Sequence, residues 1–193
     1  MTKPSTRETI LKTALECFNE LGFQATTIEE IRVRSQASIG SIYHHFASKE
    51  QLAASLYVEG LRNYQEGFLQ TLEKNNDVEA GIKALVIYHL TWVSNNAELA
   101  RYIFQARQSE SVGAEKSTLK SLNKGVFQAF TKWFKPYIKA GKVKDLPMDV
   151  CLSILIGPSQ EFARHWLSGR VKTDTTQASF LLADAAWNSL IRN

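Results

Sequence analysis

The chain has 193 residues, of which 44% are hydrophobic and 22% are charged, and its formal net charge is +4. This composition provides enough apolar residues for a folded core and excludes a disordered chain. The longest apolar stretch, residues 84–93, is interrupted by His89 and Thr91 and is shorter than the ~18 residues of a membrane span. Charges occupy the N-terminal segment where a secretion signal requires an apolar run, so we expect a cytoplasmic protein without a membrane partner.

The charge is unevenly distributed along the chain. Residues 1–50 contain six basic and six acidic residues, whose charges cancel. Residues 116–144 contain eight lysines and no acid. On a helical wheel the six lysines from Lys116 to Lys139 separate from the apolar residues, which favours a solvated basic face above a core; an anionic effector or a membrane surface is the alternative. Because bulk charge identifies no nucleic-acid surface, such a surface must be recognised from local motifs.

Two cysteines, Cys17 and Cys151, lie far apart within apolar helical patterns. A disulfide framework or a thiolate metal site requires more cysteines or closer ones, so both are predicted to be small buried residues. The chain has no glycine-rich phosphate loop, no H-E-x-x-H zinc motif and no nucleophile elbow. We therefore predict that the protein is not an enzyme and needs neither a metal nor a cofactor.

Helical signals dominate the N-terminal part of the chain. A capping box that starts at Ser5 begins the first predicted helix, and Gly22 ends it. Thr27 starts another capping box and a short helix that ends at about residue 34. Ser38 caps a third short helix that continues to residue 46, and Ser48 caps a fourth that continues to about residue 74.

Five further helices are predicted in the remainder of the chain, and no strand alternation is found. The pattern changes near residue 50 from short capped helices to long ones, which predicts a domain boundary there. We therefore expect an all-α protein of about nine helices, with one domain over 1–50 and a larger one over 51–193. The five helices are expected at 78–95, 97–108, 115–140, 147–168 and 175–191.

The segment from Thr26 to Leu52 has the pattern of a helix-turn-helix, in which the second of two short helices enters the DNA major groove. Ile42 and Phe46 lie four residues apart on that second helix and are predicted to anchor it inward. Helix N-termini attract phosphate, and side chains on the outer face can contact bases or phosphates. The residues predicted to contact DNA are Thr27, Ser38, Ile39, Gly40, Ser41, Tyr43, His44 and Lys49.

This segment, with the helix before it, resembles the TetR/AcrR family of bacterial transcriptional regulators. The matching positions are Thr26, Thr27, Ile31, Ser38, Gly40, Tyr43, His45, Phe46, Lys49, Glu50 and Leu52. Together with the preceding helix, the match covers about the first quarter of the chain. The resemblance implies a three-helix DNA-binding domain followed by a larger helical domain for ligand binding and dimerisation. One departure is Gln36, which replaces the turn glycine and must either adopt a positive φ or take another geometry.

The resemblance also implies dimerisation through the last two long helices, which form a four-helix bundle with those of a partner. The predicted helix at 147–168 is apolar nearly all round, so it must be covered on more than one face. A role confined to the core of one chain is the alternative. The residues predicted at the dimer interface are Leu152, Ile156, Ala163, Leu167, Phe180 and Trp187.

A small-molecule effector bound within the C-terminal domain is a further implication of the resemblance. His89 lies in the middle of an apolar helix face, where a polar group needs a side chain, water or ligand as its partner. Glu161 and His165 are interpreted as an ion pair within the chain, with a pocket or dimer contact as alternatives. The aromatic candidates either line a cavity or belong to the core. The candidate effector-binding residues are His89, Trp92, Phe104, Phe127, Phe130, Trp133, Glu161 and His165.

The sequence therefore predicts a homodimeric DNA-binding regulator, a repressor that binds a palindromic operator in double-stranded DNA and is released by a small-molecule effector. A helical ligand-binding or interaction protein with weakened DNA specificity is the alternative, because residues 1–50 are neutral and Gln36 alters the turn. The two hypotheses differ in whether the purified protein selects DNA fragments that share a palindrome.

Overall fold

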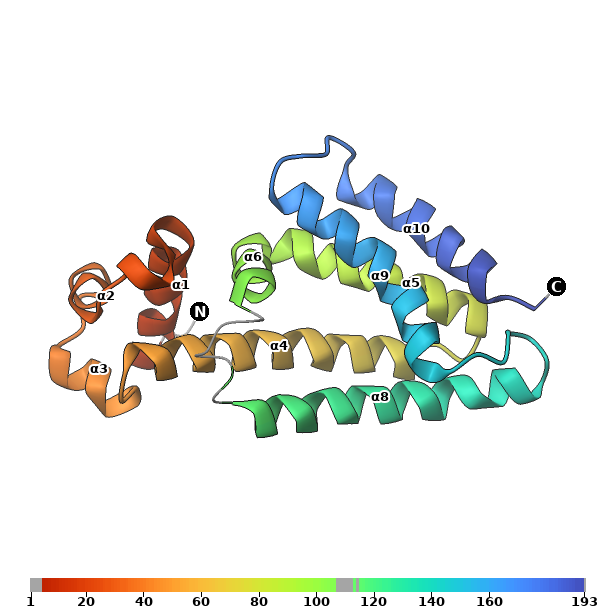
Figure 1. The fold of residues 1–193 in the computed structure, drawn as a ribbon, viewed down its shortest axis with the longest axis horizontal. Coiled ribbons are helices and arrows are strands. Elements are labelled where there is room, and N and C mark those ends of the chain that lie inside the picture. The colour runs from red at the N-terminus through yellow and green to blue at the C-terminus, as the bar shows by residue number, and fades with distance from the viewer. Residues whose placement is uncertain (1–4, 107–112, 114, 193) are drawn as a thin grey trace. The chain divides into compact units, whose positions relative to one another are not determined.

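The computed structural model describes residues 5–106, 113 and 115–192. Within these residues the chain forms nine α-helices and no strand, apart from one isolated bridge between Val143 and Ile191, so the predicted all-α fold is confirmed. None of the described helices combines the length and the hydropathy that a bilayer crossing requires. The helices, labelled in Figure 1, are α1 (Thr6–Ala25), α2 (Ile28–Ser35), α3 (Ile39–His45), α4 (Lys49–Glu73), α5 (Val78–Asn95), α6 (Ala97–Ala106), α8 (Lys116–Lys139), α9 (Met148–Leu167) and α10 (Thr175–Leu190).

The helix ends follow the capping signals of the sequence. The hydroxyl of Ser5 accepts from the backbone N–H of Glu8 at 3.3 Å, and Oε2 of Glu8 accepts from the backbone N–H of Ser5 at 2.8 Å. Asp77 and Asp174 likewise cap α5 and α10 through their side chains. Gly22, with φ 79° and ψ 160°, is not helical and interrupts α1 as predicted, and a short helical segment follows it up to Ala25. The helix end predicted at residue 108 lies outside the described residues.

The chain divides into two compact units. The first combines Met1–Leu61 with Glu98–Leu119, and the second combines Arg62–Ala97 with Lys120–Asn193. Helices α4 and α8 therefore each contribute residues to both units. The domain boundary predicted at residue 50 falls at the beginning of α4 and remains a prediction.

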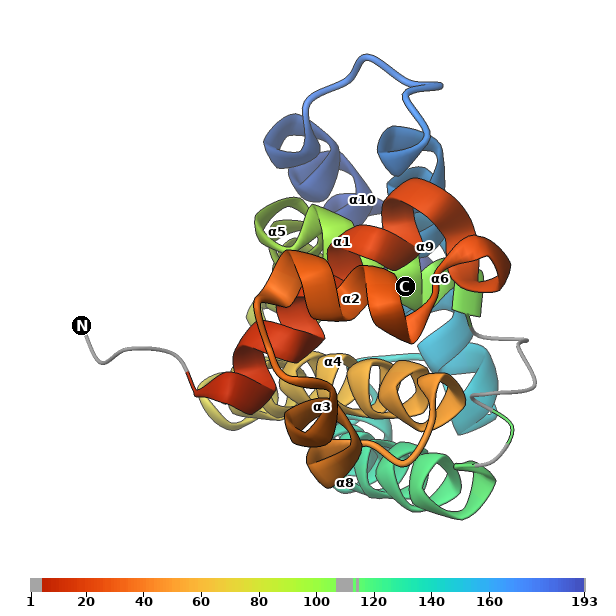
Figure 2. The ribbon, with the colours of Figure 1, turned by 90° about the vertical axis from the view of Figure 1, so that its left-hand side faces the viewer.

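The first unit is built on side chains that its helices turn inward. Ile10, Ile31 and Ile42, from α1, α2 and α3, are fully buried, and Figure 2 shows these three helices grouped together. Phe18 of α1 stacks on Tyr102 of α6 with ring centroids 5.7 Å apart, and the Tyr102 hydroxyl donates to a backbone carbonyl of α4 at 2.8 Å. The short helices α2 and α3 are stabilised by the burial of Ile31 and Ile42, because helices of this length are not stable alone in water.

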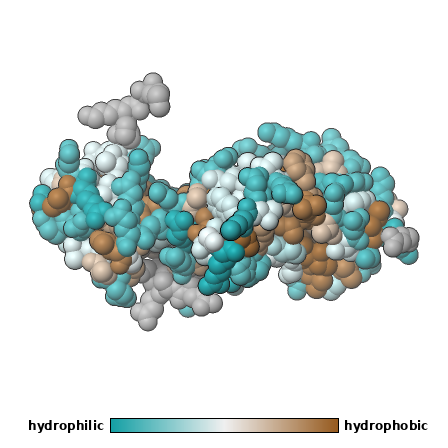
Figure 3. All heavy atoms as spheres, turned by 90° about the horizontal axis from the view of Figure 1, so that it is seen from above, coloured by the Kyte–Doolittle hydropathy of each residue, from teal (hydrophilic) through white to brown (hydrophobic). Residues whose placement is uncertain are grey.

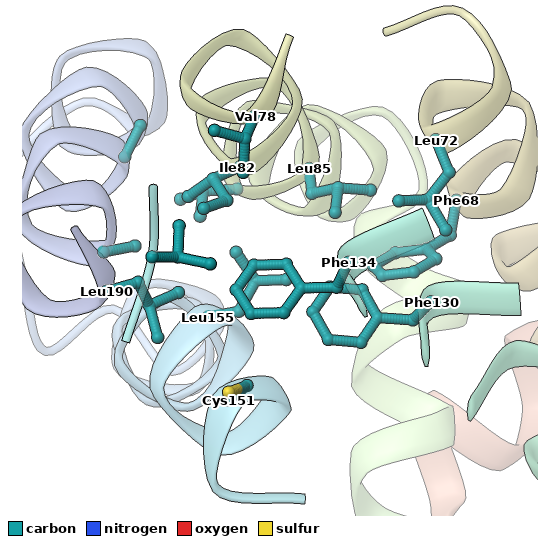
Figure 4. Close-up of a cluster of buried hydrophobic side chains, with 14 residues drawn as sticks. Phe68, Leu72, Val78, Ile82, Leu85, Phe130, Phe134, Cys151, Leu155 and Leu190 are labelled. Atoms are coloured by element: carbon teal, nitrogen blue, oxygen red, sulfur yellow. The ribbon is translucent and has the colours of Figure 1, made fainter. Parts of the chain in front are cut away.

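The second unit has its own hydrophobic core, which is drawn in Figure 4. Phe130 and Phe134 of α8 are fully buried and stack with ring centroids 5.1 Å apart. Leu190 of α10 and Cys151 of α9 belong to the same cluster. Cys151 and Cys17, the latter in the first unit, are both buried free thiols, as predicted.

The turn between α2 and α3 contains Gln36, which adopts a left-handed conformation with φ 57° and ψ 20°. The sequence left a positive φ or another geometry open at Gln36, and the positive φ is the one observed. A Cβ atom costs roughly 1 kcal/mol in this conformation, and glycine avoids that cost. We expect Gln36→Gly to raise the free energy of unfolding in urea by up to about 1 kcal/mol. Gln36→Ala keeps the Cβ atom and should give no such gain; an equal gain from both variants would contradict the explanation.

Candidate nucleic-acid interface

Helices α2 and α3 both begin with a side-chain cap. Oγ1 of Thr27 accepts from the backbone N–H of Glu30 at 3.1 Å, and Oγ of Ser38 accepts from the backbone N–H of Ser41 at 3.1 Å. Thr27 and Ser38 are exposed, whereas Thr26 is buried and donates its hydroxyl to a backbone carbonyl of α1 at 2.8 Å. The caps fix where both helices start, and other first-turn N–H groups lack intrahelical partners, as at any helix start.

Helix α3 has one buried side and one exposed side. Ile42 is fully buried and Phe46, which follows the helix, is 1% exposed, so the predicted inward anchors are confirmed. Ile39 is 46% exposed, Tyr43 is 53% exposed, and His44 is exposed as well. An aliphatic and an aromatic residue four positions apart, both open to solvent, suit contact with another surface.

Lys49, predicted to contact phosphate, is engaged within the chain. Its ammonium donates to the backbone carbonyls of Phe23 at 2.8 Å, Gln24 at 3.4 Å and Thr26 at 2.8 Å. It also lies 4.5 Å from the centre of the Phe23 ring. Because an ammonium has three donors, these bonds use all of them. The side chain therefore joins the start of α4 to the segment before α2, and the predicted phosphate contact of Lys49 at a helix start is left to its backbone.

The arginines of the helix-turn-helix are paired with acids. Arg32 donates to both carboxylate oxygens of Glu29 at 2.7 and 2.8 Å, and these bonds hold the pKa of Glu29 below its ordinary value. Arg34 contacts Glu30 at 2.6 Å and Glu20 at 2.5 Å. Both arginine charges are therefore compensated by these three glutamates. Sequence reasoning missed the pairs within α2, although their spacing of three and four residues is typical of helical ion pairs.

In the second unit, His89 of α5 is 4% exposed. Its Nδ1 atom lies 2.9 Å from the hydroxyl of Tyr64, while its Nε2 atom is buried without a hydrogen-bond partner among the described residues. The rings of Tyr64 and Trp92 meet edge to face at 5.2 Å, and Nε1 of Trp92 donates to Oδ1 of Asn63 at 2.9 Å. Tyr64 is thus an internal partner of the kind that the sequence required for His89. It satisfies only one of the two ring nitrogens.

Burial lowers the pKa of His89 to about 4. Between the ordinary value of ~6.5 and this value, the unfolded chain binds a proton that the folded chain does not. Stability from the neutral imidazole is therefore complete above pH ~6.5 and is lost as the pH falls towards 4, by on the order of 3 kcal/mol. Chemical denaturation of wild type and His89→Gln across this range should show that wild type loses about 3 kcal/mol more of its free energy of unfolding than the variant as the pH falls. Parallel curves would show that His89 is not responsible.

The other predicted effector-binding residues differ in their surroundings. Phe104 belongs to the first unit, whereas the remaining candidates belong to the second. Phe130 is a core residue, and the indole of Trp133 donates to the carbonyl of Asn75 at 2.8 Å. Phe127 is 40% exposed on α8 and therefore does not belong to the core. A helical wheel does not reveal which apolar positions are covered, so the sequence left open which aromatic residues line a cavity and which belong to the core.

Glu161 and His165 form the expected pair within α9. Nε2 of His165 lies 3.0 Å from Oε1 of Glu161, and both side chains are well exposed. Arg164 also contacts Glu161 at 3.2 Å. The pair therefore lies at the surface of the second unit and contributes little to stability by itself.

Helices α9 and α10 expose an apolar face that differs from the predicted one. Val150 is 41%, Phe180 57% and Leu181 62% exposed, and hydrophobic residues are visible on the surface of this unit in Figure 3. A groove of about 500 Å³ is lined by Asp149, Val150, Ser153, Ile154, Pro158, Ala185, Ala186 and Ser189.

Several predicted interface residues lie elsewhere on these helices. Ala163 is fully buried within the chain and is not available to a partner, which corrects its assignment. Leu152, Ile156 and Trp187 pack against the core of the second unit and are only partly exposed. Phe180 retains the exposure that an interface residue needs.

The sequence model of the tetR family of bacterial regulatory proteins matches residues 10–56. The HTH-type transcriptional repressor NicS of Pseudomonas putida is 25% identical over 183 residues, which are 94% of this chain and 82% of NicS. The HTH-type transcriptional activator FasR of Mycolicibacterium smegmatis is 22% identical over 187 residues, which are 95% of this chain and 82% of FasR.

The solved structure of the transcriptional regulator FadR from Bacillus subtilis, in complex with stearoyl-CoA, has the same fold. Its TM-score is 0.78 at 19% identity, and the match covers 94% of this chain and 97% of FadR. The fold correspondence thus extends over nearly the whole chain, beyond the helix-turn-helix.

Two short capped helices on a packed base, with an exposed face on the second, have the geometry of a helix-turn-helix, a motif that DNA-binding transcription regulators use. Residues 10–56 match the tetR family of bacterial regulatory proteins, and nearly the whole chain is similar in sequence to the transcriptional repressor NicS. The relatives it matches are transcription regulators, a class whose members are generally not enzymes.

Proposed function

We propose that the protein is a homodimeric repressor that binds a palindromic operator and leaves it when a small-molecule effector binds the second unit. The exposed face of α3, with Ile39, Tyr43 and His44 beside the buried Ile42, carries the DNA-binding part of this proposal. The repressor NicS supports the direction of regulation. Activation, as in the name of FasR, is the alternative, which the position of the operator relative to the promoter decides. A regulator of this kind acts in the cytoplasm, on the bacterial chromosome.

In the proposed complex α3 lies in the major groove and reads bases with its exposed side. Ile39 contacts a thymine methyl group, and Ser41 and His44 form hydrogen bonds with base edges or phosphates. Tyr43 donates its hydroxyl to a phosphate while its ring packs on the sugar. Gly40 supports this docking, because a Cβ atom built there meets nothing within 4 Å and no internal contact requires a glycine.

Phosphate contacts fix the register of the protein on the duplex without reading its sequence. The capped starts of α2 and α3, at Thr27 and Ser38, offer backbone N–H groups for this purpose. Lys49 contributes through its backbone at the start of α4, since its ammonium is occupied. The proposed phosphate contacts are therefore made mostly by neutral groups.

The proposed dimer forms through the exposed apolar face of α9 and α10. Val150, Phe180 and Leu181 lose their exposure when two such faces pack as a four-helix bundle, and the groove along Ile154 and Ala185 receives side chains of the partner. Two-fold symmetry then matches a palindrome whose half-sites lie ~34–36 Å apart.

A different class of protein, a helical ligand-binding or interaction protein with weakened DNA specificity, is the second candidate. The paired arginines of α2 favour it, because few free cations are left to attract phosphate. The left-handed Gln36 in the turn is a second departure that supports it.

Selection of genomic DNA fragments on the purified protein at moderate salt, followed by sequencing, separates the two candidates. We expect the selected fragments to share a palindrome, and the genes beside it to indicate the chemistry of the effector. Enrichment without a common motif would reject the operator-binding regulator in favour of the interaction protein.

The neutral character of the interface has a consequence for salt dependence. We expect a shallow decrease of operator affinity with salt in wild type, because Arg32 is held by Glu29. Glu29→Gln frees this cation and should raise affinity at low salt and steepen the slope of log K against log salt by about 0.9 for one new phosphate contact. Fluorescence anisotropy with a labelled operator measures both. Glu73→Gln, at an exposed acid of the second unit, is the matched control, and identical slopes for the two variants would reject this prediction.

A further inference from the structure

A groove of about 290 Å³ lies between α4 and α8 within the second unit. The two helices run next to each other there (Figures 1 and 2), and a hydrogen bond joins them. In this bond Nε2 of Gln65, a buried residue of α4, donates to Oδ1 of Asn123 on α8 at 3.0 Å. The groove is separate from the face proposed for dimerisation, which belongs to α9 and α10.

Gly125 keeps this groove open. A Cβ atom built at Gly125 meets no atom within 4 Å, so the glycine is not needed for close packing between the helices. Leu69 of α4 and Leu122 and Val126 of α8 give the groove an apolar lining. Its volume is at the lower end of the ~300–1,000 Å³ typical of ligand pockets, so it suits a small ligand or one segment of a longer one.

The charged groups at the groove favour an anion. Arg62 lines it with a guanidinium that has no ion pair or hydrogen bond among the described residues, and Oε1 of Gln65 likewise has no partner there. Lys120 and Lys124 are exposed and adjoin two lining residues in the sequence. Glu66 is the single acid in the lining, so the local balance of Arg62, Lys120, Lys124 and Glu66 is positive.

We propose that this groove binds the effector, and that the effector is a small amphipathic anion with an apolar body and one carboxylate or phosphate group. The apolar body packs on Leu69, Leu122 and Val126, and the anionic group pairs with the fork of Arg62. This inference rests on the proposed function, since it names the ligand and the place of the effector site.

Calorimetry of the full chain, with no DNA present, tests the groove directly. The probes are decanoate and decyl phosphate below their micelle concentrations, with decanol as the neutral analogue. Wild type should bind at least one of the two anions about tenfold more tightly than decanol; the preferred anion identifies the head group. Equal binding of decanol and both anions would overturn the assignment of an anionic ligand.

Two charge variants should move the affinity in opposite directions. Arg62→Gln should weaken binding of the preferred anion about tenfold, and Glu66→Gln should tighten it severalfold, because one removes the attracting charge and the other the opposing charge. Lys135→Gln, on the same helix as Gly125 but outside the lining, should leave the affinity unchanged. Opposite signs, or equal effects at all three positions, would overturn the proposal.

Gly125→Leu fills the groove and should abolish binding of the anion, whereas Gln128→Leu, an exposed position outside the lining, should not.

Operator binding by the unliganded variants separates this inference from the proposed function. Operator binding by wild type with no heat from either anion would overturn the groove assignment alone. Binding of an anion without any operator binding would remove the regulatory role and keep the ligand site.

Discussion

Tyr43→Ala is expected to lower operator affinity by about 100-fold while the fold remains intact. Tyr43 is 53% exposed and has no role in the core, so its loss changes stability by no more than about 0.5 kcal/mol. A lost phosphate contact and its sugar packing cost about 1–3 kcal/mol, and a dimer loses them at both half-sites. Electrophoretic mobility shift with the selected operator measures the affinity, and thermal unfolding measures the stability.

His44→Ala should act in the same direction through lost contacts to base edges or phosphates. The matched control is Leu21→Ala, because Leu21 is 44% exposed on α1 and lies outside the predicted DNA-contacting set. This variant should keep both the affinity and the Tm. Unchanged operator affinity in both Tyr43→Ala and His44→Ala would remove α3 as the recognition helix.

Leu181→Asp is expected to convert the dimer into monomers and to reduce operator affinity by at least ~100-fold. Leu181 is 62% exposed and lies beside Phe180 in the exposed apolar face of α10. A carboxylate on this face would be buried without a partner in the four-helix bundle, a cost of several kcal/mol for each chain. The monomer itself should fold normally, since the side chain is open to solvent in one chain.

Leu21→Asp places the same carboxylate at an exposed leucine of the first unit and serves as the control. Sedimentation velocity should give a dimer for wild type and for this control, and a monomer for Leu181→Asp. A Leu181→Asp protein that remains dimeric would contradict the proposed interface and direct attention to another surface.

The sequence predicted the helices well because their starts carry local signals. Ser5, Thr27 and Ser38 each accept the expected backbone hydrogen bond three residues on, so capping alone located these helix starts. The inward position of Ile42 and Phe46 followed from their spacing of four residues. Such features depend on neighbours within one turn, which a sequence states directly.

Features that depend on several elements were predicted less well. Helix α9 is apolar nearly all round, and its wheel did not distinguish Ala163, buried by the other helices, from Val150, which stays exposed. The role of Lys49 depends on carbonyls of Phe23 to Thr26, more than twenty residues away, whose directions no sequence pattern specifies. The same holds for Phe104, which contributes to a different unit from the other aromatic candidates.

The central claim is that two copies of this chain read one palindrome, and native mass spectrometry of the operator complex tests it most directly. The selected palindromic duplex and a duplex with only one half-site are each mixed with the wild-type protein. We predict two chains, or a multiple of two, on the palindrome, and at least ~100-fold weaker binding to the half-site duplex. A single chain bound to the palindrome, with equal affinity for the half-site duplex, would contradict the account.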